Sequence, residues 1–417
     1  MIMKKAREYA RFAILPLLLA ALLLAPSCKK DGPKETTTPH TLIFYFTGTE
    51  LSYYFYRNIS AAKDAIRQDI MGRSRVVCFF QHTDKTKADL IELVYVEGSC
   101  EEKVLATYDL PKQMDGEHLS CFFNEIVRSA PADSYGLVMA GHALAWIPVD
   151  AAPFPRAMRR AAGTAAAEHA AQSGDDFWRK AQSDIVTRHF GEKYSDTQSN
   201  IFDIETLSSA LASTGVKFDY ILFDACFMAN VESVYDLRDN ADYIIGAPCE
   251  ILGDGFPYQN ALPYLLRNGG RSHDLPQVCK AFHDQYASKF GYSGSVALID
   301  CAQMDALAEI MKKINSGATK DYDRDEIQTF EGQSRHVFYD LGDYVDKMCG
   351  DPALKAMFDA QMSRTVPCKY TLGSFWSNYD DKSGIYPITA FSGLSTSAPS
   401  EVYRDDYAET SWYKATR

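Results

Sequence analysis

Two residues with catalytic side chains each follow closely after a predicted buried strand. The apolar run Phe218–Phe223 leads into Cys226, and the run Tyr135–Ala140 leads into His142. Active sites of parallel α/β sheets gather at the carboxyl ends of the strands, so we expect both side chains at one edge, with the sulfur exposed. There a thiol can attack an acyl carbon while an imidazole manages the proton. The alternative is two structural residues, because 9 His and 10 Cys offer many chance pairs.

The segment after Cys226 favours the nucleophile interpretation. A helix is expected to begin where the strand stops and to continue through Val231–Leu237. The amino end of a helix carries partial positive charge, which favours a thiolate nearby. The sequence therefore predicts that the nearby helix terminus favours the reactive thiolate form of Cys226.

The chain around these residues alternates strand and helix patterns. Short apolar runs typical of strands are 41–46, 75–80, 90–96, 103–110, 135–140, 218–223, 243–247 and 295–299. Segments with helical spacing of apolar residues are 51–71, 117–128, 201–213 and 231–237. The runs 90–96 and 103–110 predict a hairpin through Gly98. The alternation predicts an α/β fold around a mainly parallel sheet, which we expect to continue after Gly294.

The composition narrows the range of functions. The fractions of hydrophobic residues (46%) and charged residues (24%) are those of a globular chain. The net charge is −12 and no basic stripe is visible, so a nucleic-acid partner is not expected. No Cys-x-x-Cys pair occurs, so we expect no dedicated metal cluster and no required cofactor. The acidic run Asp321–Asp325 is interpreted as solvated charge, with calcium binding as the alternative.

The first forty residues have the features of a targeting segment. Basic residues precede an apolar stretch from Phe12 to Ala25, which is too short to span a membrane and typical of a signal peptide. Small residues then precede Cys28, as in bacterial lipoprotein signals. We therefore expect residues 1–27 to be removed, Cys28 to carry lipid, and residues 28–40 to form a polar tether to the membrane of the cell envelope. The alternative is a plain secreted protein.

The segment Phe218–Tyr258 resembles the signature of the clostripain family of cysteine peptidases. It contains an Asp-Ala-Cys-x-Met core, an Asn-Val-Glu helix start and a Gly-Asp-Gly-Phe-Pro-Tyr loop. The sequence Gly-His-Ala-Leu-Ala-Trp around His142 is similar to the family's His-Gly-x-Gly-Trp strand end, and Phe338–Leu341 and Ser383–Pro387 resemble further landmarks. The resemblance implies a caspase-like three-layer α/β/α sandwich over residues 41–417. It also implies an endopeptidase that cuts peptide or protein substrates after Arg or Lys.

The resemblance assigns roles to individual residues. Cys226 matches the nucleophile and His142 the catalytic histidine. Asp224 and Asp254 match acids of the pocket that receives the basic substrate side chain, and carboxylates suit that task because they pair with guanidinium and ammonium groups. The alternatives are a helix cap for Asp224 and a turn residue between two glycines for Asp254. Glu250 is interpreted as a surface or capping acid.

One departure from the family pattern concerns Ala143, where the family has glycine. The backbone N–H groups of Ala143 and Cys226 are the expected oxyanion donors. If the turn needs a positive φ at position 143, alanine would resist it and misaim its N–H group. A catalytically inactive caspase-like lipoprotein that binds peptide or protein is therefore the alternative function. A disulfide-held structural surface protein is a weaker one.

Residues from about 150 to 200 form an Ala-rich polar stretch, which predicts a long surface insertion. The resemblance implies activation by cleavage between the histidine and cysteine strands. Arg156, Arg159 and Arg160 are thus candidate self-cleavage sites for an enzyme that prefers basic residues. The alternative is a solvated loop with ordinary arginines.

Overall fold

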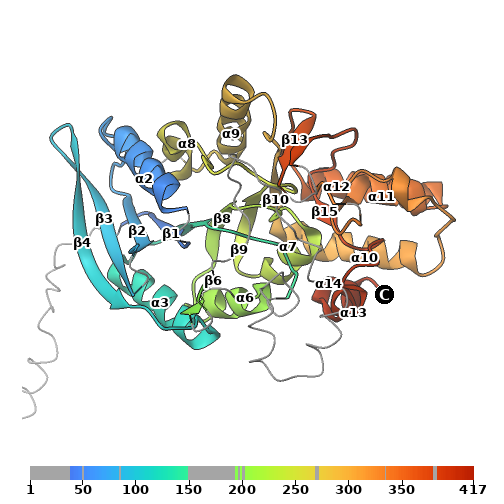
Figure 1. The fold of residues 1–417 in the computed structure, drawn as a ribbon, viewed down its shortest axis with the longest axis horizontal. Coiled ribbons are helices and arrows are strands. Elements are labelled where there is room, and N and C mark those ends of the chain that lie inside the picture. The colour runs from blue at the N-terminus through green and yellow to red at the C-terminus, as the bar shows by residue number, and fades with distance from the viewer. Residues whose placement is uncertain are drawn as a thin grey trace, which may run out of the picture. The chain divides into compact units, whose positions relative to one another are not determined.

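A nine-stranded mixed β-sheet forms the centre of the computed structural model (Figure 1). The structure describes residues 38–48, 51–83, 86–148, 193–195, 198–199, 202–267, 272–333, 335–378 and 383–417. The strand order is β12-β10-β9-β8-β5-β1-β2-β3-β4. These strands are β1 (Thr41–Phe46), β2 (Arg75–Gln81), β3 (Lys87–Val96), β4 (Ser99–Asp109), β5 (Tyr135–Ala140), β8 (Phe218–Asp224), β9 (Ala241–Gly246), β10 (Val296–Asp300) and β12 (Cys368–Tyr370).

The middle of the sheet is parallel and its two margins are antiparallel. Strands β9, β8, β5, β1 and β2 run parallel to one another. Strands β3 and β4 at one margin, and β10 and β12 at the other, pair antiparallel. Every residue of β1 and β5 is buried, as expected for strands that are covered on both faces. The prediction of a mainly parallel sheet is confirmed, and the chain after Gly294 does continue it, through antiparallel strands.

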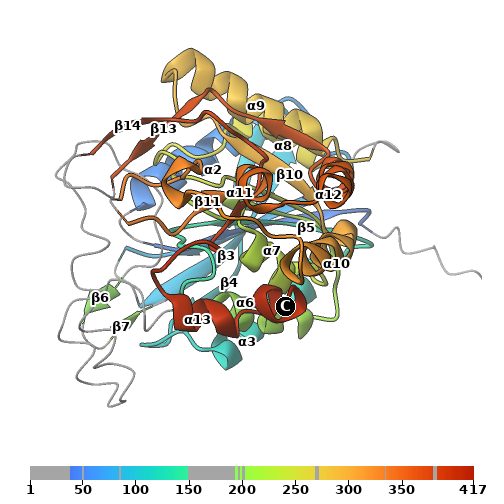
Figure 2. The same cartoon turned by 90° about the vertical axis from the view of Figure 1, so that its right-hand side faces the viewer.

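Helices cover both faces of the sheet (Figures 1 and 2). One face packs against α2 (Ser52–Ile66), α8 (Tyr258–Leu265) and α9 (Leu275–Lys289). The other packs against α3 (Gly116–Ser129), α6 (Ile204–Ala212), α7 (Val231–Leu237), α10 (Met304–Asn315), α11 (Leu341–Met348), α12 (Pro352–Thr365) and α14 (Ser411–Ala415). The result is the three-layer α/β/α sandwich that the sequence predicts.

Shorter elements complete residues 38–417, which form one unit. Three two-stranded sheets pair β6 (Lys193–Ser195) with β7 (Gln198–Ser199), β11 (Tyr339–Asp340) with β15 (Ser395–Thr396), and β13 (Ser374–Ser377) with β14 (Gly384–Pro387). The remaining helices are α13 (Arg404–Glu409) and the 3-10 turns η1 (Cys301–Gln303) and η2 (Arg324–Glu326). Within the described part of the chain, no helix has the length and apolar character that crossing a bilayer requires.

Local sequence signals explain several boundaries. Helices α3 and α7 begin after Asp115 and Asn230, whose side chains accept a backbone N–H of the first turn. The predicted hairpin of β3 and β4 turns at Glu97 and Gly98, with φ angles of 47° and 83°. Positive φ at both central residues matches the right-handed twist of the paired strands.

Candidate active site

Strand pairing brings Cys226 and His142 to the same edge of the sheet. Strands β5 and β8 are parallel neighbours, and Ala140 is paired in register with Asp224. His142 and Cys226 each lie two positions beyond this pair, so both leave the sheet at the same level. Neighbouring strands are about 4.8 Å apart. The thiol and the imidazole therefore come from adjacent strand ends.

The Cys226 thiol is covered in this structure. We expected an exposed sulfur, but the residue is fully buried. The backbone N–H of Ile251 donates to Sγ at 3.3 Å, and the thiol lies 3.7 Å from the carbonyl oxygen of the same residue. Ile251 belongs to the segment that follows β9, and sequence reasoning had not placed this segment over the strand end. The thiol is thus closed off from an incoming carbonyl in this form of the chain.

The turn directly after the cysteine is strained. Phe227 has a φ of 62°, and its ring stacks on Phe338 with centroids 4.8 Å apart. Its backbone N–H donates to the carbonyl of Cys249 at 3.1 Å. A bulky residue with positive φ is a genuine outlier and persists only where its surroundings fix it. The buried stack and the hydrogen bond therefore hold the turn that carries Cys226.

The expected helix does not begin at Cys226. Helix α7 starts at Val231, and its N-cap is Asn230, whose side chain accepts the Ser233 N–H at 3.1 Å. Residues 227–230 lie between the cysteine and the helix. Because the field of a helix terminus falls off within about one turn, the argument that this helix activates the thiol is wrong.

His142 leaves the sheet in a segment whose backbone suits alanine at position 143. His142 is nearly buried, with 8% of its surface exposed. Ala143 is not among the described residues with positive φ, whereas Ala145 has a φ of 54°. The alanine that replaces the family's glycine therefore adopts an ordinary conformation here. Trp146 then anchors the segment, because its indole N–H donates to the Ser397 hydroxyl at 2.9 Å.

Asp224 is a buried acceptor at the end of β8. Its carboxylate accepts the Tyr258 hydroxyl at 2.7 Å and the Phe256 backbone N–H at 3.2 Å. It does not cap a helix, since Asn230 fills that position for α7. Asp224 instead fixes the segment that enters α8 against the strand that carries the cysteine.

Asp254 lies in a turn beside α2 and α9. The Gly255 N–H donates to the Leu252 carbonyl across this turn. The Asp254 carboxylate is 2.6 Å from the Lys289 ammonium and 3.3 Å from the Arg57 guanidinium. All three residues line a groove of about 330 Å³. The charge of Asp254 is therefore already balanced by two cations of the chain itself.

Two buried acids were not identified as site residues from the sequence. Glu250 is fully buried and accepts the Asn378 backbone N–H at 2.9 Å, so its interpretation as a surface acid is wrong. It directly precedes Ile251, the residue over the thiol. The apolar neighbours of Glu250 in the sequence were the available signal of burial.

Glu232, the second of these acids, lies in the first turn of α7. Its carboxylate accepts the Thr396 hydroxyl at 2.8 Å and the Ser397 N–H at 3.0 Å. Burial is the main cause that raises the pKa of Glu232 to about 7. Glu232 links the helix after the cysteine to the segment that also holds Trp146.

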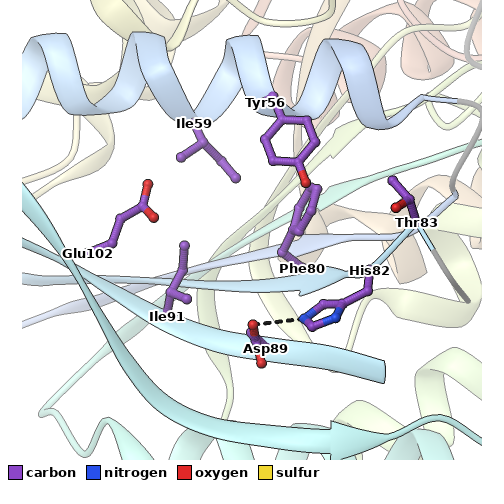
Figure 3. Close-up of a pocket in the computed structure, with 8 residues that line it drawn as sticks. All are labelled: Tyr56, Ile59, Phe80, His82, Thr83, Asp89, Ile91 and Glu102. Carbon is purple, nitrogen blue, oxygen red and sulfur yellow. Dashed lines mark hydrogen bonds and ion pairs between the residues drawn. The ribbon is translucent and has the colours of Figure 1, made fainter. Parts of the chain in front are cut away.

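A pocket lies further along the same edge, beyond β1 (Figure 3). Phe80 of β2 is paired with Phe46, which is paired with Ala140, so His82 follows β2 at the level at which His142 follows β5. The pocket has a volume of about 370 Å³. It is lined by Tyr56, Ile59, Phe80, His82, Thr83, Asp89, Ile91 and Glu102. In Figure 3 the His82 ring points to the Asp89 carboxylate, 2.8 Å away.

Other predicted residues fall outside the site or outside the described residues. Cys28 and the arginines Arg156, Arg159 and Arg160 are not described. In the acidic run 321–325, Asp323 caps η2 and Arg324 pairs with Glu401. The nine described cysteines are free thiols in this structure.

Comparison with known proteins identifies the fold. A family model described as the clostripain family matches residues 172–415. A secreted C11 cysteine protease from Bacteroides thetaiotaomicron, iotapain, is 31% identical, with a TM-score of 0.76 over 91% of this chain and 99% of that one. The chain belongs to the clostripain family. Membership confirms the resemblance seen in the sequence and makes the protein a relative of cysteine peptidases.

Two further clostripain-family structures share this fold. An inactive zymogen C11 protease from Parabacteroides distasonis is 26% identical, with a TM-score of 0.71 over 91% of this chain and 99% of that one. A second secreted protease from B. thetaiotaomicron, in complex with an irreversible peptide inhibitor, is 22% identical with a TM-score of 0.70, over 91% of this chain and 98% of that one. At that identity the last likeness concerns the fold. No curated protein matches the chain.

Proposed function

We propose that this clostripain-family chain is a cysteine endopeptidase that cleaves after Arg or Lys with a Cys226–His142 dyad. The observation that carries the proposal is the pairing of Ala140 in β5 with Asp224 in β8. His142 and Cys226 each follow this pair by two residues, so both lie at the same edge of the sheet. Family membership supplies the class of reaction.

The proposed chemistry uses groups at this edge of the sheet. The Cys226 sulfur attacks the carbonyl carbon of the scissile bond and passes its proton to His142. The backbone N–H groups of Ala143 and Cys226 donate to the oxyanion. His142 then gives the proton to the leaving amine, and water, activated by the same imidazole, hydrolyses the thioester. No metal or cofactor is required for these steps.

A preference for basic residues would come from the acids near the cysteine. Asp224 is two positions before Cys226, and its carboxylate would pair with a substrate guanidinium or ammonium group once the buried site opens. The Asp254 carboxylate could bind the basic side chain of a substrate only after it releases Lys289 or Arg57. We therefore assign the main role in basic specificity to Asp224.

We also propose that the form seen here is latent. The burial of Cys226 under Ile251 supports this, and a relative is described as an inactive zymogen. Cleavage at Arg156, Arg159 or Arg160 would release the segment between the two catalytic strands and open the site. The enzyme itself would make this cut, because these arginines match its proposed preference for basic residues.

The test measures hydrolysis of fluorogenic peptides that end in Arg, Lys, Gln or Leu, before and after limited proteolysis of the chain. Turnover of only the Arg and Lys peptides, abolished in Cys226→Ala and retained in Cys301→Ala, is expected. Cys301 is a matched control because it is also a buried thiol. Activity that survives Cys226→Ala, or a preference for the neutral peptides, would refute the assignment.

The alternative is an inactive relative that binds peptides, which the covered thiol favours. Tight binding of an Arg-containing peptide without turnover after proteolysis would establish it. The pocket of Figure 3, on the same edge, is a suitable place for a further side chain of a bound peptide in either case.

Attachment to the cell envelope is a separate proposal. Lipid on Cys28 would hold the peptidase domain on a membrane through residues 28–40, and a relative is described as secreted. Metabolic labelling with a radioactive fatty acid should mark the wild-type protein and leave Cys28→Ser unmarked. Equal labelling of both proteins would exclude Cys28 as the anchor.

A further inference from the structure

A second cluster of titratable side chains lies at the amino-terminal edge of the sheet. His40 directly precedes β1, Asp219 is the second residue of β8, and His273 lies shortly before α9. One potential ligand atom from each of these residues lies within 4.8 Å of the other two. The seven residues of β8 separate the cluster from Cys226 by on the order of 20 Å. The cluster is therefore distinct from the candidate active site.

The His273 ring is held in the way that metal-bound histidines usually are. Its Nδ1 is 2.8 Å from the Leu265 carbonyl oxygen, which can only accept, so Nδ1 carries the hydrogen. The ring then directs Nε2 to the Asp219 carboxylate, 2.8 Å away. Metal-ligating histidines almost always donate their other N–H to a carbonyl or carboxylate in this manner. In the neutral ring, a lone pair and a carboxylate oxygen face each other, which is an arrangement that attracts a cation.

The Arg267 guanidinium is the cation that contacts His273 and Asp219 in the structure. Its Nε donates to His273 Nε2 at 3.2 Å, and its Nη2 is 3.5 Å from the Asp219 carboxylate. The Arg267 side chain is 41% exposed. It can therefore move into solvent without disturbing the core.

His40 completes the donor set from the buried side. The residue is fully buried, its Nδ1 is 3.0 Å from the Ser134 hydroxyl and 3.6 Å from the Asp219 carboxylate, and its ring centroid is 4.5 Å from that of His273. Its Nε2 has no hydrogen-bond partner among the described residues.

We propose that His40, Asp219 and His273 bind a divalent transition-metal ion, Zn²⁺ foremost, in place of the Arg267 guanidinium. Two imidazole nitrogens and a carboxylate oxygen are donors that Zn²⁺ prefers. Two ligand atoms on a tetrahedral Zn²⁺ ion lie about 3.3 Å apart. The distances of 2.8 and 3.6 Å to the Asp219 oxygen bracket that value. The bound ion links the amino-terminal ends of β1 and β8 to the segment before α9. It therefore stabilises the fold and takes no part in peptide cleavage.

The experiment titrates Zn²⁺ and Co²⁺ into the metal-stripped full chain that carries Cys226→Ala, so that the catalytic thiol cannot bind metal. One equivalent should bind, with a Co²⁺ spectrum that lacks a thiolate charge-transfer band and with a rise in melting temperature. His40→Ala and His273→Ala should each weaken binding by at least about 100-fold. His118→Ala is the matched control, because His118 is exposed and pairs with Asp115, and it should bind as before.

Arg267→Gln provides a variant that should improve binding. Removing the competing positive charge should tighten Zn²⁺ binding on the order of tenfold. The proposal is overturned if the chain binds no stoichiometric metal, if the Co²⁺ spectrum shows thiolate ligation, or if Arg267→Gln binds no tighter. These outcomes are independent of the proposed peptidase activity.

Discussion

The indole N–H of Trp146 lies 2.9 Å from the hydroxyl oxygen of Ser397. The backbone N–H of Ser397 in turn donates to Glu232 in the first turn of α7. The segment that carries His142 and the helix that follows Cys226 therefore both form a hydrogen bond with Ser397. This shared anchor fixes the two halves of the proposed dyad relative to each other.

Replacing Trp146 by phenylalanine should loosen that anchor. The change removes the indole donor and leaves the Ser397 hydroxyl oxygen unpaired, at an expected cost of about 1–2 kcal/mol in the free energy of unfolding. Turnover of the activated enzyme should fall as well, since His142 is less well positioned. Tyr220→Phe is the control, because it also deletes a buried donor but at the opposite edge of the sheet. An equal loss of turnover in both variants would contradict a local effect on His142.

Glu232 makes stability depend on pH. Its folded pKa of about 7 lies above its ordinary value of 4.5, so its contribution to stability is full below pH 4.5 and is lost as pH rises through 7. Glu232→Gln cannot titrate. Wild type should therefore lose on the order of 3 kcal/mol relative to the variant across this range, as measured by urea unfolding at several pH values. Parallel pH profiles for the two proteins would show that Glu232 is not the titrating group.

Replacing Ala143 and Ala145 by glycine should have opposite effects on the stability of the fold. Ala145 has a φ of 54°, so Ala145→Gly relieves left-handed strain and should stabilise the fold by about 0.5–1 kcal/mol. Ala143 has no such strain, so Ala143→Gly should destabilise the fold by a similar amount and bring no gain in turnover. Thermal unfolding and peptide hydrolysis of both variants check this. A marked rise in activity of Ala143→Gly would mean that the family glycine is needed for the oxyanion.

The covered thiol should react slowly until the chain is cut. In the intact protein, iodoacetamide should modify Cys121, which is exposed, well before Cys226, which is buried. Limited proteolysis within residues 150–200 should accelerate modification of Cys226 and leave the rate at Cys121 unchanged. Mass spectrometry of the labelled peptides measures both rates. Rapid labelling of Cys226 before any cleavage would contradict the latent form.

The parallel core could be predicted closely from the sequence. Strands β1 and β5 have the predicted bounds, because strands that are buried on both faces are continuous apolar runs. Helix α7 covers the predicted run 231–237 but lacks the predicted start at the end of β8, because the N-cap Asn230 begins it later. Helix α8 was not predicted, since it is only eight residues long and Pro263 stands inside it. The short strands β12 to β15 give too little periodicity to be recognised.

The candidate site was predictable only where strand ends determine it. Cys226 and His142 could be placed because each follows a strong strand signal. The closure of the thiol could not, because Ile251 reaches it from a loop with no regular pattern. The same holds for His40, Asp219 and His273, which are far apart in the sequence and meet through the topology alone.

Ile251 contacts the Cys226 sulfur on both sides of its α-carbon, through its own N–H and its own carbonyl oxygen. Because these two groups belong to successive peptide groups, the sulfur is uncovered only when the whole residue moves away. A cut that displaces this residue should therefore convert dormant molecules into competent ones. Partial cleavage of a sample would then change the fraction of working enzyme and leave the rate per working molecule the same.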